Sequence, residues 1–367
     1  MLENPGLYVH FPWCVKKCPY CDFNSHPLSP AADFDAYASA LQQDLSAQLG
    51  ESQPRFASAF LGGGTPSLCP PEHLARIISA LPLTPDAEVT MEANPGTLEH
   101  ADFGAYRAAG INRLSLGAQS FNAGHLLKLG RIHTVEDIPR VFAAARAGGF
   151  DNINLDIMWG LPGQTVADAM ADLNAAIALG PEHLSWYQLT IAPKTEFARR
   201  VPVLPVEDTL GAMETAGLAR LRDAGYQRYE VSAYARADRR CAHNLNYWTF
   251  GDYLGIGAGA HGKRTDGDFV ARTEKARQPR LYLKDPAQTG VTQVDPAALA
   301  FEFLLNALRL EDGVAIAVFE ARTGLSWDVI AERWATLVDQ GLVKGDRCAT
   351  TARGYRYLDS VLERFLT

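Results

Sequence analysis

The sequence predicts an α/β fold: an open, partial (β/α)6 barrel followed by a mostly helical, winged-helix-like domain. Six short apolar runs alternate with amphipathic stretches over the first half of the chain, which is the pattern of βαβ units. The connections are short, so the strands should be parallel with right-handed crossovers. Six units are too few for a closed eight-unit barrel. In the last fifth of the chain the pattern changes to consecutive helices.

The apolar runs place the barrel strands at residues 7–11, 56–61, 88–92, 113–119, 153–158 and 184–190. Helices are expected between them, at residues 33–49, 71–80, 98–109, 135–147 and 166–179. Parallel α/β folds bind their ligands at the carboxyl ends of the strands. We therefore expect the site residues at that end of the barrel.

Three parts are expected along the chain: the barrel at 1–205, a barrel extension at 206–290 and a C-terminal domain at 291–367. The extension is less regular and carries a strand at 229–234 and a glycine-rich run at 251–262. The C-terminal part predicts helices at 297–308, 316–323, 326–340 and 354–366, with a short hairpin from 342–343 and 348–351. We interpret it as a lid or packing domain.

Composition narrows the function classes. The 367 residues carry a formal net charge of −8, which argues against general nucleic-acid binding. No signal peptide or membrane-spanning run is recognisable, so a cytoplasmic protein with reduced cysteines is expected. Peripheral membrane contact through a local patch and a homodimer are both left open.

Three cysteines, Cys14, Cys18 and Cys21, follow the first strand with the spacing C-x-x-x-C-x-x-C. Three thiolates on one loop can hold three irons of a [4Fe–4S] cluster and leave the fourth iron open for a small ligand. The alternative is a Cys₃His zinc site with His10 or His26 as the fourth ligand. Structural zinc usually uses two separated cysteine pairs, and the sequence offers no second pair. The three other cysteines are isolated and are interpreted as buried hydrophobic residues.

Polar and glycine residues recur where successive strands end. The run Gly62-Gly63-Gly64-Thr65 follows the second strand, and its glycines would let backbone groups approach a ligand. The residues that follow or lie in later strands are Glu92, Gln119, Arg131 and Asp156. A carboxylate inside an apolar strand is costly unless it is paired, so Asp156 is expected to meet a ligand hydroxyl or Arg131.

A second group of candidates is the segment 241–248, which contains His243, Tyr247 and Trp248. His243 could ligate haem iron, and the two aromatic rings could stack on a macrocycle. The alternative is a packed turn in which His243 bonds to the backbone, and the residues taken alone favour that alternative. His261, in the glycine-rich run, could touch either ligand.

Taken together, these segments resemble the radical S-adenosylmethionine (SAM) proteins related to oxygen-independent coproporphyrinogen III dehydrogenase. The resemblance runs from Tyr8 to the C-terminal domain and implies a radical SAM partial barrel. It implies that Cys14, Cys18 and Cys21 ligate a [4Fe–4S] cluster. It also implies two sets of SAM contacts. The first set is Tyr8, Gly63, Glu92 and His261; the second, for another SAM, is Gly64, Thr65, Gln119, Arg131 and Asp156.

Two departures from the dehydrogenase resemble the haem-chaperone branch of that family. Phe23 stands where the dehydrogenase has a further cysteine, and Cys14 lies almost at the start of the chain. That branch implies haem as bound cargo, haem contacts at His243, Tyr247 and Trp248, and delivery to haem-accepting respiratory proteins. No catalytic residue is assigned. The alternative is the dehydrogenase reaction itself, oxidative decarboxylation of coproporphyrinogen III in porphyrin biosynthesis, and a third is a structural relic with zinc.

Overall fold

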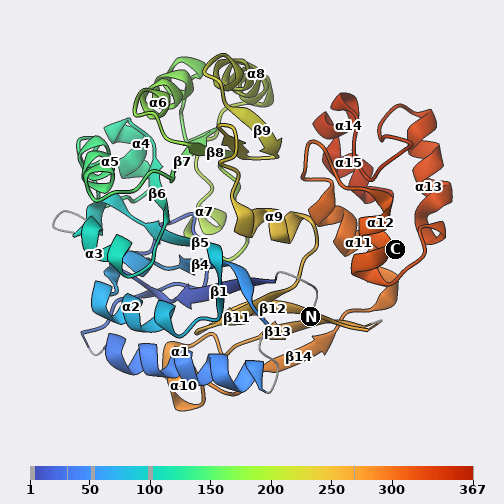
Figure 1. Ribbon diagram of the computed structural model, residues 1–367. Coiled ribbons are helices and arrows are strands. Elements are labelled where there is room, and N and C mark those ends of the chain that lie inside the picture. The colour runs from blue at the N-terminus through green and yellow to red at the C-terminus, as the bar shows by residue number, and fades with distance from the viewer. Residues whose placement is uncertain (1–4, 31, 51–53, 98–101, 268, 367) are drawn as a thin grey trace.

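In the computed structural model, which describes residues 5–30, 32–50, 54–97, 102–267 and 269–366, the chain forms one large open sheet wrapped by helices and a helical C-terminal domain (Figure 1). The twelve strands of the sheet are ordered β14-β13-β12-β11-β1-β4-β5-β6-β7-β8-β10-β9. The seven consecutive strands from β11 to β8 in this order are parallel to one another. The strands beyond them at both edges of the sheet pair in antiparallel fashion. The outermost strands, β14 and β9, are not paired with each other, so the barrel is open, as predicted.

The parallel strands are β1 (Gly6–Phe11), β4 (Phe56–Gly63), β5 (Leu83–Ala93), β6 (Arg113–Gln119), β7 (Ile153–Trp159), β8 (His183–Gln188) and β11 (Tyr253–Ile256). The antiparallel edge strands are β9 (Gln227–Glu230), β10 (Ala233–Ala235), β12 (His261–Asp266), β13 (Phe269–Glu274) and β14 (Gly290–Gln293). A separate two-stranded sheet pairs β2 (Trp13–Cys14) with β3 (His26–Pro27).

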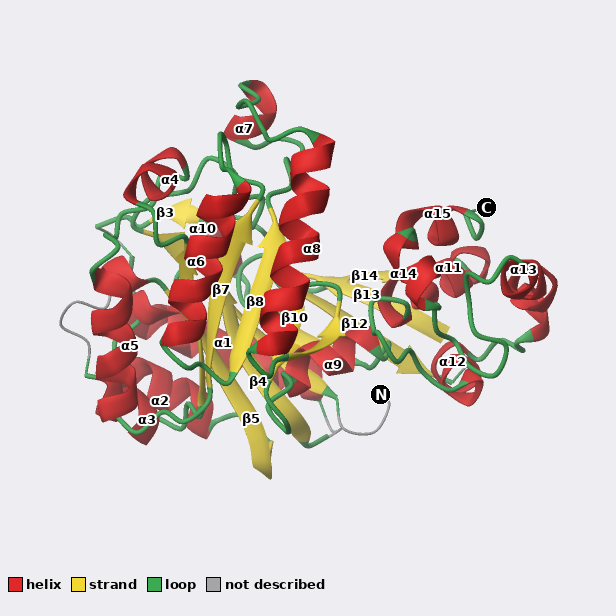
Figure 2. Ribbon diagram, turned by 90° about the horizontal axis from the view of Figure 1, so that it is seen from above, coloured by secondary structure: helices red, strands yellow, loops and turns green. Residues whose placement is uncertain are grey.

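Helices cover the outer face of the sheet (Figure 2). The barrel helices are α1 (Phe34–Leu49), α2 (Pro71–Ser79), α3 (Phe103–Ala108), α4 (Ala123–Lys128), α5 (Asp137–Ala147), α6 (Val166–Ala178), α7 (Glu196–Arg199) and α8 (Glu207–Asp223). Two 3₁₀ turns, η1 (Pro66–Leu68) and η2 (Pro95–Thr97), follow β4 and β5. One core runs between sheet and helices and includes Leu7, Leu61, Met91 and Leu155, all fully buried. Burial of such a continuous apolar layer is the main force that holds the parallel strands together.

The C-terminal domain consists of α11 (Pro296–Ala307), α12 (Ile316–Thr323), α13 (Asp328–Asp339), α14 (Ala352–Arg356) and α15 (Leu358–Glu363). Its core, with Phe303, Phe319 and Trp334, also takes in residues of the barrel extension such as Phe250. Bridges from Val343 to Thr350 and from Val314 to Cys348 form the predicted hairpin region. The divisions at 205/206 and 290/291 stay predictions, since the extension packs against both cores.

The extension, predicted to be irregular, contains α8, α9 (Ala242–Trp248) and α10 (Pro279–Lys284). The sequence hid α8 because only Met213, Gly217 and Leu221 of this helix are buried, which leaves too narrow an apolar face to show the helical period. Gly217 is needed there, since a Cβ would lie 2.0 Å from the ring of Trp186. The last helix, predicted at 354–366, is divided at Tyr357 into α14 and α15. The helix predicted at 98–109 begins with residues 98–101, which lie outside the described residues.

Candidate functional site

The cysteine loop follows β1 at the carboxyl ends of the parallel strands. The short β2–β3 pair closes the loop, and Cys14, Cys18 and Cys21 are all free thiols of intermediate exposure. Neighbouring loops reach the sulfurs: the Thr65 hydroxyl donates to Cys14 Sγ at 3.6 Å, and Arg131 Nη1 donates to Cys18 Sγ at 3.7 Å. Burial raises the pKa of the Cys14 and Cys21 thiols. The fold therefore brings all three cysteines and two predicted site residues together.

The glycine run after β4 lies directly against the start of the cysteine loop. Gly63 has φ of 111°, and a Cβ there would lie 2.4 Å from the His10 ring. At Gly64 a Cβ would meet the Trp13 carbonyl oxygen at 2.4 Å. Both positions thus require glycine. The Gly63 N–H donates to Glu92 Oε2 at 3.0 Å, which joins the second and third strand ends.

Two buried carboxylates lie inside the barrel near these strand ends. Burial, then the negative charge of Asp156, raises the pKa of Glu92 to about 8. Asp156 accepts hydrogen bonds from Ser115 Oγ at 3.1 Å and from Asn154 Nδ2 at 2.8 Å. Of the two partners expected for Asp156, Arg131 does not bond to it, because Ser115 of the neighbouring strand β6 and Asn154 of the same strand β7 already donate to the carboxylate; a ligand hydroxyl stays a prediction. Arg131 instead donates to the Gly117 carbonyl at 2.8 Å and to Cys18.

Gln119 ends β6 in a strained backbone conformation, with φ of 68° in the left-handed region. Non-glycine residues rarely adopt this region, and such strain collects at functional sites. Its side-chain oxygen accepts a hydrogen bond from the Tyr187 hydroxyl at 2.8 Å. The sequence analysis did not select Tyr187. The available signal was its position near the end of the sixth predicted strand, where site residues are expected.

Sequence reasoning also missed the role of His10 beside Tyr8. The Tyr8 hydroxyl lies 2.9 Å from His10 Nδ1, and His10 Nε2 lies 2.9 Å from the Asn24 carbonyl oxygen. Burial lowers the pKa of His10 to about 4, so the ring is neutral and links strand to loop. The signal was the two-residue spacing, which puts both side chains on one face of β1.

His261 begins β12 and is exposed, close to the end of the cysteine loop. The preceding turn contacts that loop, since Asn24 Nδ2 donates to the Ala258 carbonyl at 3.0 Å. Gly259, with φ of 81°, makes room, because a Cβ there would lie 2.1 Å from Asn24 Nδ2. The SAM candidates therefore gather at one end of the barrel, with His261 at its margin.

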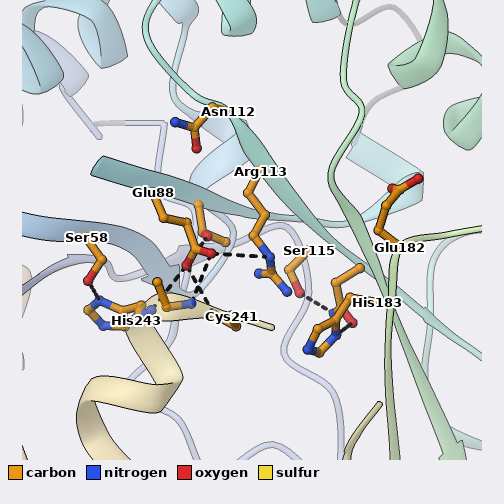
Figure 3. A network of polar contacts seen from close by, with 12 residues as sticks. Ser58, Glu88, Asn112, Arg113, Ser115, Glu182, His183, Cys241 and His243 are labelled. Atoms are coloured by element: carbon orange, nitrogen blue, oxygen red, sulfur yellow. Dashed lines mark hydrogen bonds and ion pairs between the residues drawn. The ribbon is translucent and has the colours of Figure 1, made fainter. Parts of the chain in front are cut away.

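The segment 241–248 lies at the opposite end, where the parallel strands begin (Figure 2); His243 lies beside Gly6, the first residue of β1. It forms α9, whose first turn is bound by Glu88 near the middle of β5: this carboxylate accepts from Cys241 Sγ at 3.3 Å and from the His243 N–H at 3.2 Å. Glu88 also pairs with the buried Arg113 of β6, with 4.0 Å between Nε and Oε2. This network (Figure 3) fastens α9 across the amino-terminal end of the barrel.

Both ring nitrogens of His243 are engaged, and its side chain is buried. Nδ1 lies 3.0 Å from Ser58 Oγ, and Nε2 lies 2.8 Å from the Tyr247 hydroxyl. Burial lowers the pKa of His243 to about 3. In this arrangement His243 has no free lone pair for haem iron. This resembles the packed alternative considered from the sequence, except that the ring bonds to the side chains of Ser58 and Tyr247 and not to the backbone.

Trp248 and Tyr247 line a cavity of about 170 Å³ between α9, the edge strands and α11. Arg309 of the C-terminal domain lies over the Trp248 ring at 4.3 Å, and Tyr247 packs edge-on against Tyr253. Small-molecule pockets are usually about 300–1,000 Å³. The cavity is therefore too small to enclose a tetrapyrrole.

Comparison with known proteins fits this architecture. Residues 8–176 match the radical SAM superfamily, and residues 294–357 match the HemN C-terminal domain. The chain is 45% identical to heme chaperone HemW of Escherichia coli, over 98% of each chain, and 44% identical to heme chaperone HemW of Haemophilus influenzae. The chain belongs to the HemW family of radical SAM proteins.

Relatives in this family extend to animals: a mouse mitochondrial protein named radical S-adenosyl methionine domain-containing protein 1 is 35% identical over 97% of this chain and 86% of its own length. Among solved structures, coproporphyrinogen III oxidase (HemN) of E. coli superposes with a TM-score of 0.81, covering 99% of this chain and 90% of that one, at 23% identity. The HemN-like radical SAM fold predicted from the sequence is thereby confirmed.

Membership of the radical SAM superfamily implies a [4Fe–4S] cluster and SAM, and the residues present fit both. Three thiols on one loop match the cluster's need for thiolates on separate irons. The buried Arg131 Nε has no hydrogen-bond partner within the described part of the chain, so it is available to a ligand. No described helix is both long enough and apolar enough to cross a bilayer.

Proposed function

We propose that this chain is a haem chaperone, which binds haem on a [4Fe–4S]/SAM scaffold and delivers it to haem-dependent respiratory proteins in the cytoplasm. The observation that carries the proposal is the 45% identity to E. coli heme chaperone HemW across almost the full length of both chains. Phe23 supports it, because the dehydrogenase that the chain also resembles has a cysteine at this position.

In this proposal Cys14, Cys18 and Cys21 would hold the cluster, and its open iron would be the site for SAM. Together the cluster and SAM supply one-electron redox chemistry when both are bound. The chain's own part is to position these groups. Thr65 and Arg131 donate to two of the sulfurs, and such bonds tune a cluster.

The remaining SAM contacts are proposed at the same strand ends. Gly63, Gly64 and His261 would offer backbone and ring atoms, while Tyr8 would act with its partner His10. The pKa of Glu92, raised to about 8 by burial and then by Asp156, keeps that carboxyl protonated at neutral pH, so it can donate as well as accept a hydrogen bond. Asp156 and Gln119 would bind hydroxyl or amine groups of a second ligand.

The test is a haem titration of anaerobically reconstituted protein, followed by transfer. Saturable growth of a Soret band is expected, and loss of this band to a haem-free respiratory cytochrome on mixing is expected next. A protein that gives no saturable Soret change would contradict the proposal.

The second candidate is oxygen-independent oxidation of coproporphyrinogen III to protoporphyrinogen IX. The HemN-like fold over 99% of the chain and the polar residues at the strand ends favour it. An anaerobic assay with SAM, a reductant and coproporphyrinogen III separates the two candidates. Multiple turnovers to protoporphyrinogen IX would replace the chaperone proposal with this reaction.

A further inference from the structure

The barrel end that holds the cysteines is also where exposed apolar side chains gather. Three segments at the carboxyl ends of the strands, residues 15–28, 123–132 and 191–206, are here called the mouth loops; they include β3, α4 and α7. Eight of the fifteen large hydrophobic residues that are exposed in the described chain belong to these forty residues. They are Val15, Phe23, Leu28, Leu127, Ile132, Val201, Val203 and Val206.

The mouth loops contact one another through Pro19 and Tyr20 of the cysteine loop. Gly130 lies against Pro19, since a Cβ at Gly130 would be 2.8 Å from Pro19 Cδ. The Phe197 N–H donates to the Pro19 carbonyl at 3.0 Å, and the Phe197 and Tyr20 rings are 6.4 Å apart. These contacts hold the three segments that carry the exposed apolar residues against one another.

This surface carries a charge opposite to that of the whole protein. The mouth loops contain seven lysines and arginines against two acidic residues, Asp22 and Glu196, whereas the chain as a whole has a net charge of −8. Exposed cations include Lys16, Arg199 and Arg200. An apolar surface bordered by cations complements a flat apolar ligand that carries carboxylates.

We propose that the mouth loops are the haem-binding surface, with the macrocycle against Phe23 and neighbouring apolar side chains and the propionates on the bordering cations. This inference rests on the proposed chaperone function and assigns its cargo site. Haem is the occupant that matches both features, an apolar ring system and two anionic groups. The other end of the barrel does not match: His243 is buried with both nitrogens engaged, and the cavity beside Trp248 is about 170 Å³.

In this assignment His243 has a structural role and no part in haem binding. It holds α9 against β4 and β5 through Ser58 and Glu88, and it joins the barrel to the C-terminal domain through its neighbours Tyr247 and Trp248. The haem would then lie beside the cluster, at the same end of the barrel as the SAM candidates.

The test compares haem affinity, measured by Soret titration of the reconstituted protein, in matched pairs of variants. Phe23→Ser removes an aromatic side chain that is 58% exposed in a mouth loop, and Phe269→Ser removes one that is 60% exposed on β13. The second pair reverses charge, with Arg199→Glu and Arg200→Glu together in the mouth and Arg356→Glu and Arg364→Glu together in the C-terminal domain, all four being exposed.

We expect each mouth variant to weaken haem binding about tenfold, as for a central contact residue, and each control to bind like the wild type. His243→Gln, checked for a wild-type thermal midpoint, should also keep its haem affinity and its Soret position. Equal affinities in all variants, or a loss confined to His243→Gln, would overturn the assignment and leave the chaperone function standing. Absence of haem binding by the wild type would remove both.

Anionic phospholipid vesicles provide a further arm of the test. Haem should compete with any vesicle binding by the mouth surface. If Phe23→Ser abolished vesicle flotation and left haem affinity unchanged, the surface would belong to lipid and the proposal would be refuted.

Discussion

Replacing Gly64 by alanine should both destabilise the fold and empty the cluster site. An alanine Cβ would lie 2.4 Å from the Trp13 carbonyl oxygen and 2.8 Å from the Phe11 carbonyl oxygen. These are backbone atoms that cannot rotate away, so the ends of β1 and β4 must move apart.

The size of the effect follows from the bonds that cross this contact. The Gly64 N–H donates to the Phe11 carbonyl at 2.5 Å, and the Thr65 N–H donates to the Trp13 carbonyl at 2.8 Å. Two hydrogen bonds at about 1 kcal/mol each, with about 1–3 kcal/mol for overpacking, give a loss of about 3–5 kcal/mol. The Thr65 contact to Cys14 would move as well.

The measurement is urea unfolding followed by far-UV circular dichroism, with iron and sulfide determined per chain after reconstitution. Gly211→Ala is the control, since Gly211 lies in the interior of α8 with open space around its position for a Cβ. This change should stabilise the protein by about 0.5–1 kcal/mol. If Gly64→Ala unfolded at the wild-type urea concentration with a full cluster, the argument that backbone contact requires glycine here would be refuted.

Cys18→Ala should abolish the visible absorption of the [4Fe–4S] cluster while far-UV circular dichroism stays at the wild-type level, because the core of the barrel contains none of the three loop cysteines; loss of the whole fold would contradict this. Glu88→Ala should lower the free energy of unfolding by about 3–5 kcal/mol, since it leaves buried Arg113 without its ion-pair partner; Glu88→Gln also removes the charge but keeps an acceptor for the first turn of α9, so it should cost less than Ala, and a wild-type urea midpoint for Glu88→Gln would count against the charge pair. The pKa of Glu92 is raised to about 8 in the folded protein, above its ordinary value, so its carboxyl destabilises the fold increasingly as pH rises from about 5 to about 8. Urea midpoints of Glu92→Gln should therefore fall less over this range than those of the wild type, and parallel curves would show that Glu92 is not the group responsible.

The sequence was sufficient for the features that depend on local pattern. The alternation of apolar runs and amphipathic stretches gave the order of the βαβ units, and the spacing of Cys14, Cys18 and Cys21 placed the cysteine loop after the first strand. Because parallel strands end at the same edge of a sheet, residues such as Gly63 and Glu92 could be expected to meet, and their hydrogen bond joins two of these ends.

Contacts between distant segments could not be read from the chain. Arg131 and Asp156 have opposite charges but do not pair. In the folded chain Asp156 accepts hydrogen bonds from Ser115 and Asn154. Arg131 donates to Cys18 and to the Gly117 carbonyl. Local pattern also missed α8, whose buried face is only a few residues wide.

The sequence by itself determined which chemical groups are available to a ligand: three thiols on one loop, and glycines and polar residues after successive strands. What only the tertiary structure decided is at which end of the barrel the segment 241–248 lies. A histidine followed by tyrosine and tryptophan has the same spacing whether it faces a ligand or a packed interior. In the fold, the start of α9 meets Glu88 and Ser58 across the amino-terminal end of the strands, and burial and two hydrogen bonds occupy the His243 ring.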